Sequence, residues 1–294
     1  MTVRQLDNVR TLPRAPRISV VIPTFNEAKN LPHVFAMLPA DLHEVILVDG
    51  RSVDDTVAVA RSLRPDVVVV NQNRRGKGNA MACGFAAVTG DIVVMLDADG
   101  SADAGEIPAF VAALTAGADF AKGTRFALGG GSADITGLRA WGNAWLNRAA
   151  NLLFGTSYTD LCYGYNAFWA HCLPALELDA AGPGQDTKRW GDGFEIETLI
   201  NTRIAKAGLR IAEVPSYEHE RIHGQSNLNT WRDGFRVLRA LVVERLNRKG
   251  TRPIERFTVP AAGAARPRLR LAVPQLDAVA PQVDRVAATI SQPA

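Results

Sequence analysis

Short runs of apolar residues recur along the first half of the chain, each followed by a polar segment and then by an amphipathic one. The run 18–22 is continuous and rich in β-branched residues, which is typical of a strand buried on both faces. Similar runs predict further strands at 44–48, 66–70, 92–96 and 119–122. Helical patterns separate them, at about 30–38, 54–63, 80–88 and 107–114. This alternation predicts an α/β fold with a Rossmann-like, mostly parallel sheet flanked by helices.

The second half of the chain carries longer helical patterns. They predict helices at about 138–154, 194–207 and 231–247, with a short strand at 210–214. The last helix is amphipathic, with an arginine-rich polar face, and we expect it to pack on the sheet. Tyr163, Tyr165 and Trp169 are expected in the core. The sequence has no apolar run of eighteen residues, so no transmembrane segment is predicted.

Composition divides the 294 residues into three parts. Residues 1–17 form a polar N-terminal arm without the apolar core of a secretory signal. Residues 18–248 form the folded domain, and the Ala-, Pro- and Arg-rich segment 249–294 is predicted to be a weakly ordered tail. Three scattered cysteines favour reduced thiols and a cytoplasmic protein. A net charge of only +3 argues against nucleic acid as a partner.

The polar loops of the first half are predicted to meet at one edge of the sheet. They follow successive strands, at 23–27, 49–52, 73–79 and 97–100. Ligands of parallel sheets bind beyond the carboxyl ends of the strands. Neither the dinucleotide glycine motif nor a P-loop occurs at these positions, so nucleotide binding here would rely on carboxylates and other side chains.

Asp97 and Asp99 stand two residues apart at the end of the strand 92–96. Alternate residues of an extended chain point to the same side, so the two carboxylates can converge. Mg²⁺ or Mn²⁺ would relieve their repulsion with the oxygen ligands that these ions prefer. Asp and Gly are also common turn residues, so a plain turn at Gly100 is the alternative interpretation.

Eight short segments together give the chain a family resemblance. They are 20–27 (Val-Val-Ile-Pro-Thr-Phe-Asn-Glu), the strand end 48–49 (Val-Asp), 76–80 (Gly-Lys-Gly-Asn-Ala), 97–99 (Asp-Ala-Asp), 123–125 (Gly-Thr-Arg), the helix that contains Arg139 and 149–151, 193–197 (Gly-Phe-Glu-Ile-Glu) and 221–226 (Arg-x-x-Gly-x-Ser). Over about 18–248 the sequence resembles the family 2 glycosyltransferases of the GT-A fold. Within that family it is most similar to the enzymes that transfer mannose or glucose to dolichol phosphate or another polyprenyl phosphate.

The resemblance implies a role for each matching residue. A nucleotide-sugar site of the GDP-mannose or UDP-glucose type would include Pro23, Asn26, Glu27, Asp49, Lys77, Asp97 and Asp99. Asp97 and Asp99 would hold Mg²⁺ or Mn²⁺. Arg125, Arg139 and Ser226 would bind an acceptor phosphate, and the catalytic set would be Asp99, Arg125, Arg221 and Glu195. The resemblance also implies inversion at the anomeric carbon.

Some positions depart from the family pattern. Many relatives read Asp-Asp-Gly-Ser where 49–52 reads Asp-Gly-Arg-Ser, and Ser-Gly-Phe-Arg where 163–166 reads Tyr-Gly-Tyr-Asn. Ser101 replaces a frequent Gln, and Asn227 replaces a Lys. These differences leave the exact donor and acceptor open.

Three functions therefore remain open. The first is transfer of the sugar to a polyprenyl phosphate, an acceptor that is already anionic and needs no strong base. The second is transfer to a hydroxyl of a soluble metabolite or polysaccharide, which needs a base, and Asp192, Glu195 and Glu197 are the candidates. The third function is a nucleotide-sugar binding module without turnover.

Glu195 and Glu197 could instead simply favour a helix start, and Arg125 and Arg139 could be solvated surface charges. Peripheral contact of the basic last helix with an anionic membrane surface, on the inner face, is also open.

Overall fold

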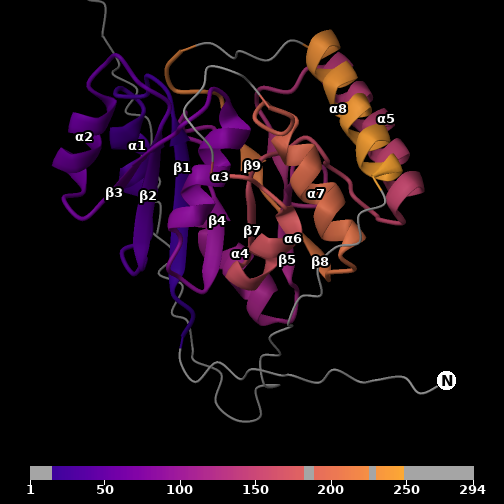
Figure 1. Cartoon of the computed structure of the whole chain (residues 1–294), viewed down its shortest axis with the longest axis horizontal. Coiled ribbons are helices and arrows are strands. Elements are labelled where there is room, and N and C mark those ends of the chain that lie inside the picture. The colour runs from indigo at the N-terminus through magenta and orange to yellow at the C-terminus, as the bar shows by residue number, and fades with distance from the viewer. Residues whose placement is uncertain (1–14, 182–188, 225–229, 248–294) are drawn as a thin grey trace, which may run out of the picture. The chain divides into compact units, whose positions relative to one another are not determined.

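The computed structural model describes residues 15–181, 189–224 and 230–247. The predicted arm, except residues 15–17, lies outside these residues, as do the predicted tail and Ser226. Among the described residues, seven strands form the central sheet (Figure 1). Their order across the sheet is β3 (Val68–Asn71), β2 (Glu44–Asp49), β1 (Ile18–Thr24), β4 (Ile92–Met95), β7 (Asn166–Trp169), β5 (Phe120–Thr124) and β8 (Ile211–Pro215). The predicted mostly parallel sheet is confirmed.

Strand β7 is the exception to the parallel arrangement. It runs antiparallel to both β4 and β5, between which it is inserted. The sequence pattern did not predict this strand. Because β7 runs against its neighbours, the segment that precedes it, 160–165, reaches the edge where the parallel strands end. This reversal brings Tyr163 and Gly164 to the same edge as Asp97.

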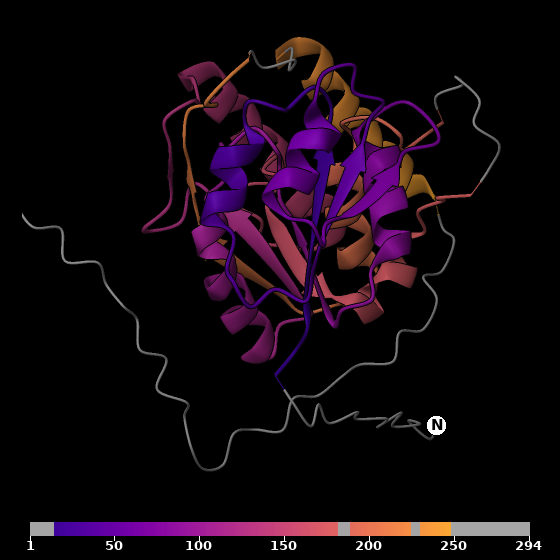
Figure 2. The same ribbon diagram turned by 90° about the vertical axis from the view of Figure 1, so that its left-hand side faces the viewer.

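Helices cover both faces of the sheet (Figure 2). One face carries α1 (Leu31–Met37), α2 (Thr56–Leu63) and α4 (Ile107–Thr115), with the short η1 (Ala104–Glu106) touching α1. The other carries α3 (Lys77–Ala87) and α7 (Ile196–Lys206), which contact each other, and α6 (Leu173–Leu176), which follows η2 (Ala170–Cys172) and packs on α7. A separate parallel pair joins β6 (Gly131–Ser132) to β9 (Tyr217–Glu218).

The core lies between these layers and depends on close approach of α3 to the sheet. A Cβ atom at Gly84 would lie 2.5 Å from Cγ1 of Val21 and 2.8 Å from Cγ2 of Val48, so glycine lets the helix approach these strands. The three aromatic residues predicted for the core, Tyr163, Tyr165 and Trp169, are all buried. None of the three cysteines forms a disulfide.

The long helices α5 (Gly137–Phe154) and α8 (Thr230–Leu246) lie side by side (Figure 1). A second apolar cluster near them includes Ala150, Tyr158 and Leu241. We expected α8 to pack on the sheet, but it packs chiefly against α5 and α7, because those helices lie between much of it and the strands. In the part of the chain that the structure describes, no helix is long and apolar enough to cross a bilayer.

Candidate active site

A cavity of about 830 Å³ opens beyond the carboxyl ends of the parallel strands. Loops after β1, β2, β3 and β4 form one side of it, and α5, the start of α7 and α8 form the other. Nine residues predicted for the site line this cavity: Pro23, Glu27, Lys77, Asp97, Asp99, Arg125, Arg139, Glu195 and Arg221. The sheet topology thus brings together residues that are up to 198 positions apart in the sequence, since 221 minus 23 is 198.

Asn26 and Asp49 do not line the cavity but shape the loops beside it. Asn26 adopts a left-handed backbone (φ 58°), and its Oδ1 accepts a hydrogen bond from the Val53 amide at 2.8 Å. The Asp49 carboxylate accepts from the backbone amides of Arg51 and Ser52, at 3.1 and 3.2 Å. These contacts position Gly50 and Arg51, which do line the cavity.

Lys77, at the start of α3, links two carboxylates across the cavity. Its Nζ lies 2.7 and 2.9 Å from the two carboxylate oxygens of Asp97 and 2.7 Å from Oε1 of Glu197. Burial favours the neutral amine, but the two carboxylates outweigh burial and raise the pKa of Lys77 above its usual value. Lys77 is therefore a fixed positive charge beside Asp97.

Asp99 faces a different cation. Oδ2 lies 2.7 Å from Nη2 of Arg221, and Oδ1 accepts hydrogen bonds from the backbone amide and hydroxyl of Ser101, at 2.9 and 2.7 Å. Gly100 adopts φ 77°, and a Cβ there would lie 2.6 Å from Cδ1 of Ile222. The turn expected at Gly100 is therefore present, and it carries Asp99 toward the segment that holds Arg221.

Glu27 adds a third carboxylate near these two. Burial raises the pKa of Glu27, and the charges of Asp99 and Asp97 raise it further. A hydrogen bond from Asn30 and the charge of Arg221, whose Nη1 is 3.9 Å from Oε1 of Glu27, oppose that rise. Three carboxylates therefore lie at this end of the cavity, with Lys77 and Arg221 as their counter-charges.

The donor set fits a divalent metal that shares its coordination with a substrate. Within the described ranges, no group of three His, Cys, Asp or Glu side chains is arranged to hold a metal by itself. Mg²⁺ sites that act on nucleotides commonly use one or two carboxylates and complete their coordination with phosphate oxygens and water. Asp97 and Asp99 supply two carboxylates to one cavity, which meets that requirement.

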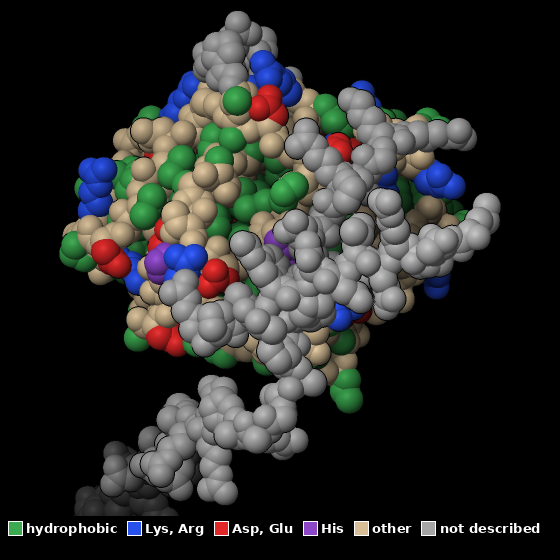
Figure 3. Space-filling view, turned by 60° about the horizontal axis from the view of Figure 1, so that its bottom comes forward, with side chains coloured by type: hydrophobic (Ala, Val, Ile, Leu, Met, Phe, Trp, Pro, Cys, Tyr) green, Lys and Arg blue, Asp and Glu red, His purple; other side chains and the backbone are tan. Residues whose placement is uncertain are grey.

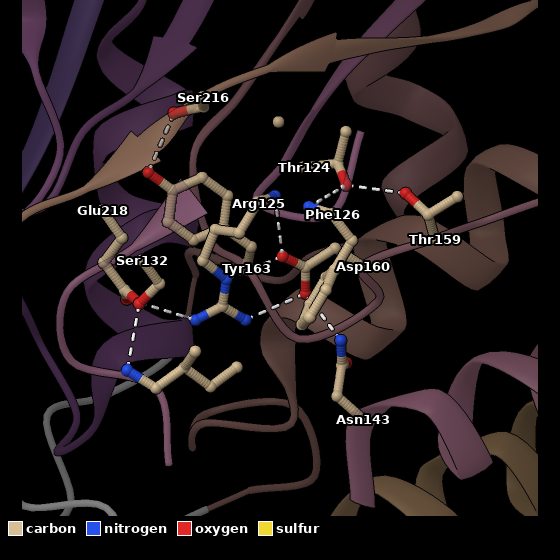
Figure 4. Close-up of polar contacts among 12 residues, drawn as sticks. Thr124, Arg125, Phe126, Ser132, Asn143, Thr159, Asp160, Tyr163, Ser216 and Glu218 are labelled. Carbon is tan, nitrogen blue, oxygen red and sulfur yellow. Dashed lines mark hydrogen bonds and ion pairs between the residues drawn. The ribbon is translucent and has the colours of Figure 1, made fainter. Parts of the chain in front are cut away.

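Arg125 lies in the cavity wall, where its charge is balanced by two carboxylates (Figure 4). Nε and Nη2 donate to the two oxygens of Asp160 at 2.7 and 2.9 Å, and Nη1 donates to Glu218 at 2.8 Å. The guanidinium also lies 4.9 Å from the centre of the Tyr163 ring. Although burial opposes the charged form, these carboxylates raise the pKa of Arg125. The alternative of a solvated surface charge is wrong for Arg125, because the fold buries its partner Asp160 completely.

Arg139 is more accessible than Arg125. It lies in the first turn of α5, lines the cavity and pairs through Nη1 with Asp134 at 3.1 Å, where the partner side chain is half exposed. Such a pair is weak in water, so the guanidinium of Arg139 can exchange Asp134 for an incoming anion.

The three carboxylates considered as bases all have protein partners. Asp192 is buried and pairs with the buried Arg74 at 2.9 Å. Glu195 accepts hydrogen bonds from the backbone amides of Gly191 and Gly193 at 3.2 Å each, and Glu197 pairs with Lys77. These side chains therefore organise the loop before α7 and the charge beside Asp97.

Sequence reasoning missed several residues that build the site. Asp160, Glu218 and Arg74 hold predicted site residues in place, and Gln72 lines the cavity. The mixed aromatic and polar composition of 158–170 is a sequence signal that could have drawn attention to Asp160. Its partner Arg125 could not be identified in this way, because the two residues are 35 positions apart. Pairing over such separations is decided by the sheet order.

Residues 19–171 match the model of the glycosyl transferase family 2 domain. With a mostly parallel sheet, helices on both faces and an acidic pair at the carboxyl end of β4, the chain has the GT-A fold. It belongs to glycosyl transferase family 2 and is a glycosyltransferase.

Curated relatives extend this similarity beyond the family domain. An uncharacterised glycosyltransferase of Mycobacterium tuberculosis is 43% identical over 222 residues, covering 72% of this chain and 89% of the relative. The undecaprenyl-phosphate mannosyltransferase of Micrococcus luteus is 32% identical over 225 residues, covering 72% of this chain and 88% of the relative. The polyprenol monophosphomannose synthase of Mycolicibacterium smegmatis is 32% identical over 223 residues, with coverage of 72% and 81%.

Solved structures share the fold at lower identity. Glucosyl-3-phosphoglycerate synthase of Mycobacterium tuberculosis, crystallised with Mn²⁺, UDP and phosphoglyceric acid, has a TM-score of 0.59 and 23% identity, covering 78% of each chain. The same enzyme with Mn²⁺, UDP-glucose and glycerol 3-phosphate gives a TM-score of 0.60. At this identity the comparison supports the fold alone.

Proposed function

We propose that this protein transfers a hexose from a nucleotide sugar to a polyprenyl phosphate, with a divalent metal and inversion at the anomeric carbon. The observation that carries this proposal is that Asp192, Glu195 and Glu197, the candidate bases, are all held by protein partners. A phosphate acceptor is anionic near neutral pH and needs orientation rather than deprotonation. Two relatives, an undecaprenyl-phosphate mannosyltransferase and a polyprenol monophosphomannose synthase, support the same acceptor class.

The donor would occupy the end of the cavity that contains Glu27, Asp97 and Asp99. The metal would be held by Asp97 and Asp99, and when bound it stabilises negative charge on the departing diphosphate. Arg221, already beside Asp99, would donate charge-assisted hydrogen bonds to the same phosphates. Lys77 would supply a further positive charge next to Asp97.

The acceptor phosphate would approach from the α5 side of the cavity. Arg139 is the accessible arginine there, whereas Arg125 is held by Asp160 and Glu218 and would contribute its field and the shape of the wall. The predicted contribution of Ser226 stays a prediction, since that residue lies outside the described ones. On the part of the face that Figure 3 draws in colour, Lys and Arg side chains lie scattered, some with Asp or Glu side chains beside them. Such mixed charge fits a small-molecule substrate better than nucleic acid.

The direct test is a transfer assay with undecaprenyl phosphate in detergent. Labelled GDP-mannose and UDP-glucose would each be supplied with Mn²⁺ or with EDTA, and sugar that partitions into organic solvent would be counted. We expect one donor to give a metal-dependent lipid product that Asp99→Asn reduces at least about a hundredfold. Sugar transfer confined to water-soluble acceptors would overturn the proposal.

A soluble phosphorylated acceptor is the second candidate. The observation in its favour is the fold shared with glucosyl-3-phosphoglycerate synthase, whose crystals contain phosphoglyceric acid. The same assay with 3-phosphoglycerate and UDP-glucose separates the two, because that product stays in water. Thermal unfolding with each donor, with and without Mn²⁺, gives an independent readout of donor binding, since a ligand of the native state raises its stability.

A further inference from the structure

The catalytic cavity does not end at its charged residues but continues along an apolar wall. Gly142 and Leu146 line it from α5 and Ile135 from the residues just before α5, while Gly234 and Val237 line it from α8 and Phe194 from the residues just before α7. Asn143 of α5 and Arg236 of α8 line the cavity beside these residues. The apolar surface here would remain wet if the acceptor were a small phosphorylated metabolite.

Two glycines keep space open in this wall. A Cβ atom added at Gly142 or at Gly234 would meet no atom within 4 Å. Both lie inside helices, where glycine is about 1 kcal/mol less favourable than alanine. Packing against a neighbouring element does not require either glycine. Because neither residue carries a side chain, their effect here is to leave space between α5 and α8.

Large apolar side chains lie exposed on the two helices that form the wall. Trp141 and Trp145 on α5 are 62% and 60% exposed, and Phe235 on α8 is 71% exposed. Arg148 and Arg245 are exposed on the same two helices. Tryptophan together with arginine is typical of surfaces that meet the headgroup region of a bilayer. Trp141 and Phe235 are the sequence neighbours of Gly142 and Gly234, so an exposed apolar side chain stands next to each glycine of the wall.

We infer that the wall between α5 and α8 binds the proximal isoprene units of the acceptor. The phosphate lies toward Arg139, the chain runs past Gly142 and Gly234, and it leaves beside Trp141 and Phe235. A linear apolar chain is the occupant that fits, because the wall is continuous with the cavity in which the acceptor's reacting end must lie. This inference rests on the proposed function and adds a chain-binding site to it.

The test compares acceptor phosphates of different chain length. For the full-length protein, KM would be measured with ethyl phosphate, geranyl phosphate and farnesyl phosphate at saturating donor. Each buried methylene strengthens binding roughly fourfold, so we expect KM for farnesyl phosphate to be at least about a hundredfold below that for ethyl phosphate. Gly142→Leu and Gly234→Leu should each reduce that ratio at least about tenfold by filling the space.

The matched control is Gly137→Leu, at the first position of α5. A Cβ there also meets no atom within 4 Å, but Gly137 does not line the cavity, so this variant should keep the wild-type ratio. Isothermal titration with farnesyl phosphate in the absence of donor gives a readout independent of turnover, and thermal unfolding checks that each variant folds.

The outcomes separate the two proposals. If wild-type protein uses polyprenyl phosphates but KM does not depend on chain length, the chain-binding site is wrong and the proposed function stands. The same holds if Gly142→Leu and Gly234→Leu behave like Gly137→Leu. If the protein transfers sugar only to soluble acceptors, the proposed function fails, and the chain-binding site fails with it.

Discussion

Lys77 and Asp97 form an ion pair in the cavity beyond the carboxyl ends of the parallel strands, with Nζ 2.7 and 2.9 Å from the two carboxylate oxygens. The same ammonium lies 2.7 Å from Glu197. A carboxylate proposed as a metal ligand is therefore already neutralised by a side chain of the protein. If Asp97 holds a metal ion as proposed, that ion competes with Lys77, so we expect the ammonium to weaken metal binding to the free protein.

Removal of that ammonium should strengthen metal binding to the free protein. In Lys77→Met the carboxylates of Asp97 and Glu197 lose their shared cation, and the negative potential of the cavity increases. We expect the dissociation constant for Mn²⁺ without nucleotide to fall at least about threefold, as measured by the electron paramagnetic resonance signal of free Mn²⁺. Lys206→Met, which removes a lysine paired with Glu244, is the control and should leave it unchanged. Weaker Mn²⁺ binding in Lys77→Met would contradict this account.

The ion pair between Arg125 and Asp160 should be important for stability. Asp160 is fully buried and also accepts a hydrogen bond from Asn143 at 3.0 Å. Asp160→Asn removes one of the two carboxylates that balance the buried Arg125 and leaves Glu218 as the other, so it should lower the free energy of unfolding by about 3 kcal/mol. Urea denaturation measures this. Asp134→Asn, which breaks the more exposed pair with Arg139, should cost less than about 1 kcal/mol. Similar losses in the two variants would refute the distinction.

Glu195 is expected to organise a loop rather than to act as a base. Glu195→Gln keeps a carbonyl oxygen that can accept from the amides of Gly191 and Gly193, whereas Glu195→Ala keeps none. With a phosphate acceptor, kcat and its pH profile should therefore change little in Glu195→Gln and fall in Glu195→Ala. A loss of more than about a hundredfold in Glu195→Gln would instead identify Glu195 as a general base.

Lys122 should make stability increase with pH in the alkaline range. Its side chain is fully buried, and burial lowers its pKa from 10.5 to about 8, although Asp160 and Glu197 partly oppose this. Between pH 8 and 10.5 the unfolded chain binds more protons than the folded one at this site, so the free energy of unfolding rises with pH there. Below pH 8 the folded chain holds the charged amine in a buried position, so the full cost of that burial lowers the free energy of unfolding.

The comparison variant for this effect is Lys122→Met, because it removes the titrating group and leaves the other titrations in place. From pH 7.5 to 10, wild-type protein should gain about 2 kcal/mol of unfolding free energy relative to the variant. Chemical denaturation at both pH values measures the difference. A difference that does not change with pH would show that Lys122 keeps an ordinary pKa.

Glycine at position 84 should be required for helix α3 to approach the sheet. Gly84→Ala places a methyl group against Val21 and Val48 and should cost about 1–3 kcal/mol of unfolding free energy. Gly142→Ala, in an open part of α5, should instead stabilise the protein by up to about 1 kcal/mol through helix propensity. Thermal unfolding of both variants tests the sign, and destabilisation by Gly142→Ala would show that the wall of the cavity is tighter than described.

The sequence by itself determined the class of fold and the edge where the site lies. Continuous apolar runs in β1, β2 and β4 identify buried strands, and their alternation with helices implies a parallel sheet. Asp97 and Asp99 follow directly on β4, so their place at the carboxyl edge could be predicted from local pattern alone. These features are local, because a strand's burial and its end are encoded in neighbouring residues.

Only the tertiary structure decided which residues meet. The insertion of β7 between β4 and β5 depends on which strands find each other, and no local pattern specifies it. The tertiary structure also pairs Arg125 with Asp160 and Arg74 with Asp192. It places Asn26 and Asp49 in loops beside the cavity instead of in its lining, and α8 beside α5. Burial is set largely by the residue itself, whereas the partner of a buried charge is set by packing between segments distant in the sequence.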